Sequence, residues 1–210
     1  VRFCEGPGVQ FPRATRFVVG FQYREDALRF LDALKERLRR FSLELHPDKT
    51  RLIEFGRYAA ERRGLVKKGR PEAFDFLGFT HLCARTRAGD FLLERRTMKK
   101  RMRAKLGEVK TDLMRRRHLS VRKQGEWLGG VVRGYFAYHA VPTNIRTLQA
   151  FRREATRAWR RALRRRSQRD RTNWERMSRL AERWLPRARI QHPWPNDRFD
   201  ASTRGGSRVR

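Results

Sequence analysis

The hydrophobic pattern of the sequence changes near residue 97, and this change limits the folds open to the chain. Before that point, short apolar runs are separated by Gly, Pro and charged residues, as in small strands joined by turns. After it, apolar residues recur every three or four positions as far as about residue 185. The two patterns predict an α+β chain, in which a region of short strands with one helix precedes an all-α basic bundle.

Four segments with different expected structures follow one another along the chain. Residues 1–16 are expected to be irregular, 17–96 to form the α+β part, 97–185 the helical part, and 186–210 a Pro-rich turn with a flexible basic tail. Within 17–96 the expected elements are strands at 17–21, 43–45, 51–55, 74–82 and 91–95, a helix at 25–41 and a loop at 57–72. The last two strands are expected to pair as a hairpin because Ala88-Gly89-Asp90 is a turn signal.

Four helices are expected in the second half. They are predicted at 97–117, at 120–138, at 142–166 and from the capping box Thr172-Asn-Trp-Glu175 onward. Thr97 and Ser120 are the expected N-caps of the first two. Trp159 and Trp174 lie on apolar stripes and are expected to face the core, and Gly134 is expected to permit close helix packing. Residues 97–185 should therefore fold on their own.

Positive charge is the second constraint, and it concerns partners. The formal net charge is +31, and 97–210 contain 32 of the 53 basic residues but only 9 of the 22 acidic ones. Such a balance favours a polyanionic partner, with nucleic acid first and a membrane surface second. No apolar run is long enough to span a bilayer, and two cysteines are too few for a disulfide scaffold. A cytoplasmic protein with no membrane partner is expected.

The basic residues most suited to RNA phosphates lie in two stretches without any acid, at 95–105 and 157–169. A solvated helix face usually mixes both signs of charge, which these stretches do not. The candidate RNA-binding residues are Arg95, Arg96, Lys99, Lys100, Arg101, Arg103, Lys105, Arg157, Arg160, Arg161, Arg164, Arg165, Arg166 and Arg169.

Four segments, in order and at matching spacing, resemble one protein family. They are Phe17-Val-Val-Gly-Phe21 with Glu25-Asp-Ala, Leu43-Glu-Leu-His-Pro-Asp-Lys-Thr-Arg-Leu52, Phe76-Leu-Gly-Phe79, and the stretch from Trp159 to Met177. On these residues the chain resembles the C-terminal half of bacterial group II intron reverse transcriptase/maturases. The resemblance implies a partial reverse-transcriptase palm at 17–96 followed by the thumb, or maturase-specific, domain. It includes no counterpart of the fingers or of the first part of the palm.

The resemblance also assigns roles to individual residues. It implies that Phe76, Leu77, Gly78 and Phe79 correspond to the primer grip, and that Lys49 corresponds to a lysine near the phosphates of the incoming nucleotide. Thr15 and Arg16 stand where the family has its aspartate pair. The intact family uses Mg²⁺ there, and neither a threonine nor an arginine can replace a carboxylate as its ligand. No catalytic residue, metal or cofactor is therefore expected in this chain, and no polymerase activity.

Three functions remain open from the sequence. The first is an RNA-binding, maturase-like protein that binds structured group II intron RNA and assists splicing. The second is one chain of a split RNA-directed DNA polymerase, with a separate fingers–palm chain supplying the aspartates. The third is a decayed reading frame with only nonspecific nucleic-acid binding.

Overall fold

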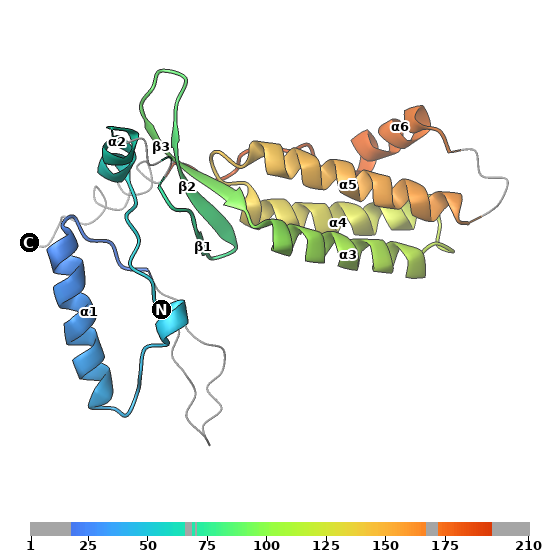
Figure 1. The fold of residues 1–210 in the computed structure, drawn as a ribbon. Helices are drawn as coiled ribbons and strands as arrows, with labels where there is room; N and C mark the ends of the chain where they lie inside the picture. Colours follow the sequence, from blue (N-terminus) through green and yellow to red (C-terminus); the bar gives the residue numbers. More distant parts are fainter. Residues whose placement is uncertain (1–17, 66–68, 70, 167–171, 195–210) are drawn as a thin grey trace, which may run out of the picture. The chain divides into compact units, whose positions relative to one another are not determined.

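The computed structural model describes residues 18–65, 69, 71–166 and 172–194, and it divides the chain into two compact units (Figure 1). The first unit is Val1–Phe76 and the second is Leu77–Arg210. The described residues contain both helices and strands, so the expected α+β class is confirmed. The described residues form strands at 74–76, 79–85 and 91–97.

The first unit contains one long helix and several short elements. They are α1 (Arg24–Arg39), a 3₁₀ turn (Pro47–Lys49), α2 (Arg57–Leu65) and β1 (Phe74–Phe76). Helix α1 confirms the helix expected at 25–41. Glu25 and Asp26 lie in its first turn, and Arg37 and Arg39 in its last, which matches the charge preference of the helix dipole.

Several strands expected in the first unit are wrong. Residues 18–21 and 51–55 are not strands, and at 43–45 only Leu45 makes an isolated bridge. A strand needs a neighbour for its backbone hydrogen bonds, and the described part of this unit offers these runs no continuous ladder. The loop expected at 57–72 is wrong for 57–65, which form helix α2, whereas residues 69, 71 and 72 have no regular structure, as expected. Ala59, Ala60 and the charged residues that follow are good helix formers.

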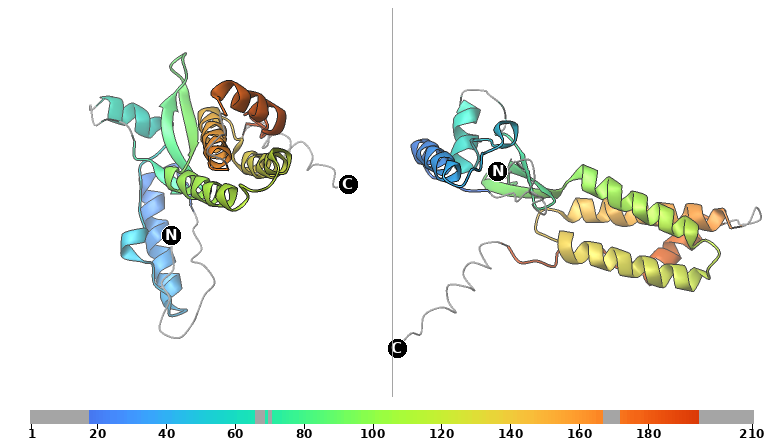
Figure 2. Two further views of the ribbon diagram at one scale, coloured as in Figure 1. Left: turned by 90° about the vertical axis from the view of Figure 1, so that its right-hand side faces the viewer. Right: turned by 90° about the horizontal axis from the view of Figure 1, so that it is seen from below.

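The second unit begins with a hairpin and continues as four helices. Strands β2 (Phe79–Arg85) and β3 (Phe91–Thr97) pair antiparallel, from Phe79 opposite Thr97 to Arg85 opposite Phe91. This confirms the expected hairpin, although the strand expected at 74–82 is interrupted by a turn at Leu77 and Gly78. The helices are α3 (Lys99–Arg115), α4 (Val121–His139), α5 (Ile145–Arg164) and α6 (Trp174–Trp184). Figure 2 shows α3, α4 and α5 side by side, with α6 against α4 and α5.

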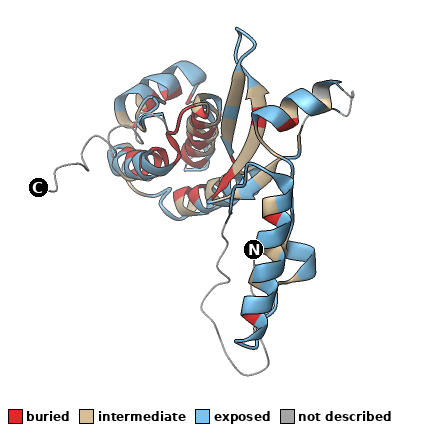
Figure 3. Cartoon of the chain, turned by 90° about the vertical axis from the view of Figure 1, so that its left-hand side faces the viewer, coloured by how far each residue is buried: buried red, intermediate tan, exposed pale blue. Residues whose placement is uncertain are grey.

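The helices of the second unit enclose a continuous apolar core (Figure 3). Trp159, Phe136, Phe151 and Leu148 are completely buried in it. The indole N–H of Trp159 donates to Gln124 Oε1 at 3.1 Å, so the one polar atom of this ring is satisfied inside the core. The expected burial of Trp159 is thus confirmed.

Close helix packing occurs at two glycines of α4. A Cβ added to Gly125 would lie 2.6 Å from the Trp184 ring, and one added to Gly129 would lie 2.5 Å from the Trp184 carbonyl oxygen. A side chain at either position would displace α6 from α4. The expectation for Gly134 is wrong, because no atom lies within 4 Å of the corresponding position there.

The N-cap residue predicted from the sequence is correct for one helix and wrong for two. Ser120 caps α4 and accepts from the Lys123 backbone N–H, as expected. Helix α6 is capped by Asn173 rather than Thr172, because the Asn173 side chain accepts from the Arg176 backbone N–H. Thr97 does not cap α3 but ends β3, and Met98 is the N-cap.

Thr97 has a different role, because its hydrogen bonds connect the hairpin to the helices. Its backbone N–H donates to Asn144 Oδ1 at 3.1 Å, and Asn144 Nδ2 donates to its hydroxyl at 2.8 Å. Two residues earlier, the Arg95 backbone N–H donates to Thr143 Oγ1 at 2.9 Å. These bonds hold β3 to the segment between α4 and α5. The boundary expected at residues 96 and 97 therefore falls inside the second unit, and the hairpin β2–β3 packs with the helices.

Candidate nucleic-acid interface

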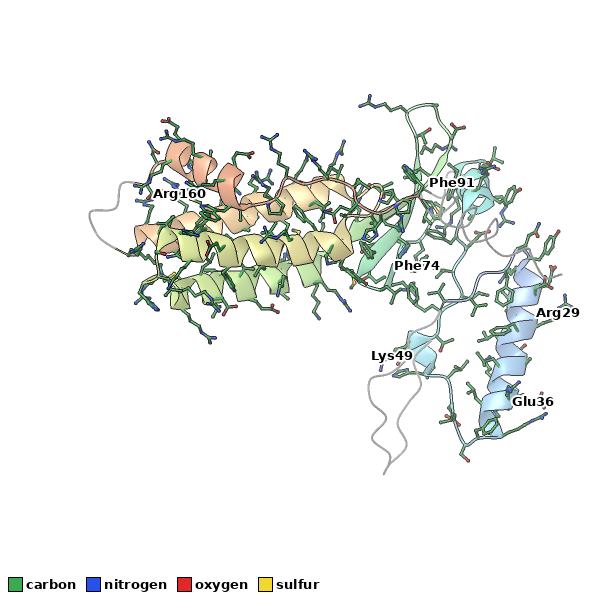
Figure 4. All side chains as sticks on the ribbon, turned by 180° about the vertical axis from the view of Figure 1, so that it is seen from behind. Arg29, Glu36, Lys49, Phe74, Phe91 and Arg160 are labelled. Carbon is green, nitrogen blue, oxygen red and sulfur yellow. The ribbon has the colours of Figure 1, made fainter. Side chains whose placement is uncertain are left out.

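A row of arginines runs along the outward side of α5. Arg146, Arg153, Arg157 and Arg164 are spaced by seven or four residues, opposite the buried residues of the same helix. The row spans 19 residues, or about 27 Å of helix axis. Helix α5 contains a single acidic residue, Glu154. Figure 4 shows the long side chains of the bundle extending outward from its helices.

Helix α3 carries a second row beside its buried stripe. Lys99, Arg103 and Lys110 share one side of the helix and are exposed. Among the described residues, none of the three makes an ion pair. The first turn of α3 contains Lys99, Lys100 and Arg101 and no acidic residue. Cations in the first turn are repelled by the positive end of the helix dipole, and a bound anion would reduce this repulsion.

Some of the candidate cations already have carboxylate partners. Arg96 donates to both oxygens of Glu94 at 2.8 Å, and this hydrogen bonding raises the pKa of Arg96. Lys105 pairs with Glu108 at 2.8 Å. Pairs this exposed are worth about 1 kcal/mol or less, so each cation can exchange its carboxylate for a phosphate at small cost.

Two arginines are used inside the fold. Arg152 donates to the carbonyl oxygens of Ala181 and Pro186, both at 3.1 Å, and to Glu182 at 2.8 Å. It thus satisfies carbonyl groups where α6 ends. Arg160 donates to the Thr172 carbonyl at 3.2 Å, and its guanidinium lies 4.3 Å from the centre of the Trp174 ring. Trp174, expected to be buried, is 48% exposed, so that expectation is wrong.

The C-terminal end of α5 carries the densest group of exposed cations. Arg161, Arg164, Arg165 and Arg166 are exposed and make no ion pair with the described residues. Their position agrees with the negative end of the helix dipole. Arg169, the last of the candidate residues, lies outside the described residues.

The primer-grip-like residues form a tight turn. Leu77 and Gly78 have φ angles of 46° and 83°, and two successive positive values are typical of a type I′ turn. The Tyr138 hydroxyl donates to the Leu77 carbonyl at 2.6 Å, and the Phe79 ring stacks on Tyr138 at 5.7 Å. Leu77 itself is 64% exposed at the tip. Phe79 is thus a packing residue, whereas Leu77 is presented to solvent. Phe76 ends the other unit.

A buried polar network lies behind this turn. The His139 Nδ1 atom is 3.3 Å from the Thr97 hydroxyl, and the His139 carbonyl accepts from Asn144 Nδ2 at 2.8 Å. Burial, and then the charge of Arg101, lower the pKa of His139 to about 4. The imidazole is therefore neutral at physiological pH and does not add to the positive charge of the surface.

Lys49 lies on the first unit, at the end of the 3₁₀ turn, and is exposed. It borders an open groove of about 550 Å³ whose other lining residues are mostly apolar, among them Val18, Phe21, Phe30 and Phe74. Thr15 and Arg16 lie outside the described residues. Among those that are described, no group of three or more His, Cys, Asp or Glu side chains is placed to hold a metal ion. Neither Thr15 nor Arg16 carries a carboxylate, which is the charged oxygen ligand that an aspartate pair supplies to Mg²⁺.

No protein-family model matches the chain, and a search of curated proteins also finds no match. In the described part of the chain, none of the helices has the length and apolar character needed to cross a bilayer. The residues and their placement therefore carry the functional conclusion.

Proposed function

We propose that this chain is an RNA-binding protein of the maturase type, which binds structured group II intron RNA in the cytoplasm and assists its splicing. The observation that carries the proposal is the arginine row on α5. It presents four cations in line over about 27 Å of helix, with only one acid on that helix. The likeness of the four segments to maturases supplies the class of RNA.

The chemistry of the surface suits a phosphate backbone better than base edges. Arginine binds phosphate through two parallel N–H groups, and phosphate contacts depend on the shape of the RNA more than on its sequence. The first turns of α3, α4 and α5 all lack an acid, which favours an anionic partner at several helix starts. The proposed role includes no polymerisation, because Thr15 and Arg16 supply no carboxylate for the Mg²⁺ ions of that reaction.

A second candidate is one chain of a split RNA-directed DNA polymerase. It is favoured by the apolar surface of the first unit, where Val18, Phe41 and Leu52 are about half exposed or more. A separate fingers–palm chain would cover such a surface. Primer extension by the reconstituted pair would support this candidate, and no extension with any such partner would reject it.

The test of the first proposal is a binding comparison with the full chain. Affinity is measured for a group II intron RNA and for an unrelated structured RNA of equal length, between 50 and 300 mM salt. We expect tighter binding to the intron RNA and a log–log salt slope of about −0.7 to −0.9 per phosphate contacted. Equal affinity for the two RNAs at physiological salt would reject intron-specific binding and show that the protein binds nucleic acid nonspecifically.

A further inference from the structure

A groove of about 660 Å³ lies between α5 and α6 in the second unit. Arg153 and Arg157 line it from α5, and Trp174 and Ser178 line it from α6. Its volume is within the range of about 300–1,000 Å³ that is common for small-ligand sites. It is thus large enough for one nucleotide, and most of the side chains that line it carry a polar or charged group.

Trp174 supplies an aromatic surface at one end of the groove. It is the first residue of α6, and nearly half of its surface is exposed. Arg160 lies 4.3 Å from the ring centre and is itself held by its bond to the Thr172 carbonyl, so the indole is braced from one side. A braced, exposed indole loses little conformational entropy when a base stacks on it.

Positive charge lies beside this aromatic ring. Arg153 and Arg157 share one carboxylate, Glu154, at 3.7 and 2.6 Å. Glu182, the acid that lines the groove itself, is occupied by Arg187 at 2.9 Å and Arg152 at 2.8 Å, and these bonds lower its pKa. Four arginines thus face two carboxylates in and beside the groove, so it has an excess of positive charge.

Neutral polar groups complete the lining. Gln149 and Ser178 are exposed there, and neither side chain has a hydrogen-bond partner among the described residues. An amide and a hydroxyl can each donate and accept, which suits the polar edge of a base or a ribose hydroxyl. An acidic peptide would use the arginines but leave the indole without a stacking partner.

We propose that this groove holds one unpaired nucleotide of a bound RNA, with its base stacked on Trp174 and its phosphate held by Arg153 and Arg157. The inference rests on the proposed RNA binding and adds to it a preference for RNA with a base outside the helix. Contacts between the RNA phosphate backbone and the arginine row on α5 would supply most of the affinity. The groove would supply the preference for an extruded base.

The test compares two RNA hairpins that differ by one bulged nucleotide, at 150 mM salt, with the full chain. We expect the wild-type protein to bind the bulged hairpin about tenfold more tightly, within the range that one stacked base provides. Trp174→Leu should reduce this preference to less than twofold and leave the affinity for the paired hairpin unchanged. Trp174→Phe, which keeps a ring, should restore part of it.

The matched control is Trp194→Leu, because Trp194 is 49% exposed and does not line the groove. It should keep the full preference. A 5-iodouridine at the bulge should cross-link on irradiation to the tryptic peptide Thr172–Arg176, which contains Trp174. Circular dichroism of each variant checks that the helix content of the chain is retained.

The outcomes separate the groove from the general interface. Equal binding of both hairpins by the wild-type protein, or equal loss in Trp174→Leu and Trp194→Leu, would overturn the inference while leaving RNA binding intact. Failure to bind either hairpin would overturn the proposed function and the inference together. Competition by free adenosine monophosphate that removes the preference for the bulged hairpin in the wild-type protein, but changes nothing in Trp174→Leu, would support the groove as the site of the extruded nucleotide.

Discussion

Helices α1 and α5 have similar lengths and clear apolar stripes, yet they bury their apolar residues to very different extents. Helix α1 buries only Ala27 and Leu38, whereas α5 buries six residues, including Trp159 and Phe151. Sixteen buried residues form the core of the second unit, and in the described part of the first unit only three apolar residues are buried. An apolar stripe therefore specifies a helix, but its burial depends on the neighbours that the rest of the chain supplies.

The largest expected effect comes from Phe151, which stacks on Tyr135 in the core of the second unit. Phe151→Ala should lower the free energy of unfolding by about 3–5 kcal/mol, because it leaves a cavity. Urea unfolding followed by tryptophan fluorescence measures this, since all five tryptophans lie in the second unit. Phe30→Ala in α1 is the control and should change this transition by less than about 0.5 kcal/mol. An equal loss in both variants would show that the two units unfold as one.

Acid should destabilise the second unit through His139. The pKa of His139 is about 4 in the folded state, below its ordinary value near 6.5, so the unfolded chain binds the proton more readily between these values. The contribution of His139 to the free energy of unfolding is fully present above about pH 6.5 and is lost as the pH is lowered toward 4. Between pH 7 and 5 we expect a loss on the order of 2 kcal/mol in the fluorescence transition. His139→Gln should flatten this dependence, and an unchanged slope would contradict the cause.

RNA binding should depend on the second unit alone. Replacing Arg146, Arg153 and Arg164 by Gln should weaken binding about tenfold and make the log–log salt slope shallower by about 2, because three phosphate contacts are lost. The control removes the same charge from α1, by Arg29→Gln, Arg37→Gln and Arg39→Gln. Filter binding over a salt series measures both. A matching loss in the control would show that net charge, rather than the α5 row, determines affinity.

The smallest expected effects distinguish two glycines of the second unit. Gly78 has a φ of +83°, and a Cβ there would lie 3.2 Å from Arg101 Nη1, so Gly78→Ala should cost about 1–2 kcal/mol. Gly107 lies inside α3 with open space around it, so Gly107→Ala should stabilise by about 0.5–1 kcal/mol. Thermal unfolding compares the two. Effects of the same sign would contradict these backbone assignments.

The sequence predicted the helices well and the strands of the first unit poorly, for a physical reason. A helix satisfies its hydrogen bonds within one segment, so the apolar spacing of 25–41, 120–138 and 142–166 was sufficient to place those helices within two or three residues. A strand depends on a partner elsewhere, and the run at 51–55 has no ladder in the structure. Ser120 was recognisable as a cap, whereas Thr97 was not recognisable as the link to Asn144, which is distant in sequence.

The sequence identified the basic residues of the candidate interface. It did not show which of them are exposed and which are bonded within the fold. Nothing local distinguishes Arg152, which is bonded to the end of α6, from Arg153, which is exposed. Trp174 lies on the apolar stripe of its helix, and the sequence placed it in the core. Arg160 covers its ring instead, so the indole remains in part at the surface and lines the groove.

The bonds of Arg152 have a consequence for the order of folding. One guanidinium on α5 holds carbonyl groups about 30 positions further along the chain, where α6 ends. Such a contact closes only after both helices have formed and met, so we expect it to form late in assembly. We expect Arg152→Met, which keeps the apolar stem, to accelerate unfolding while leaving the refolding rate nearly unchanged. The attachment of α6 would then be the first part of the bundle to be released.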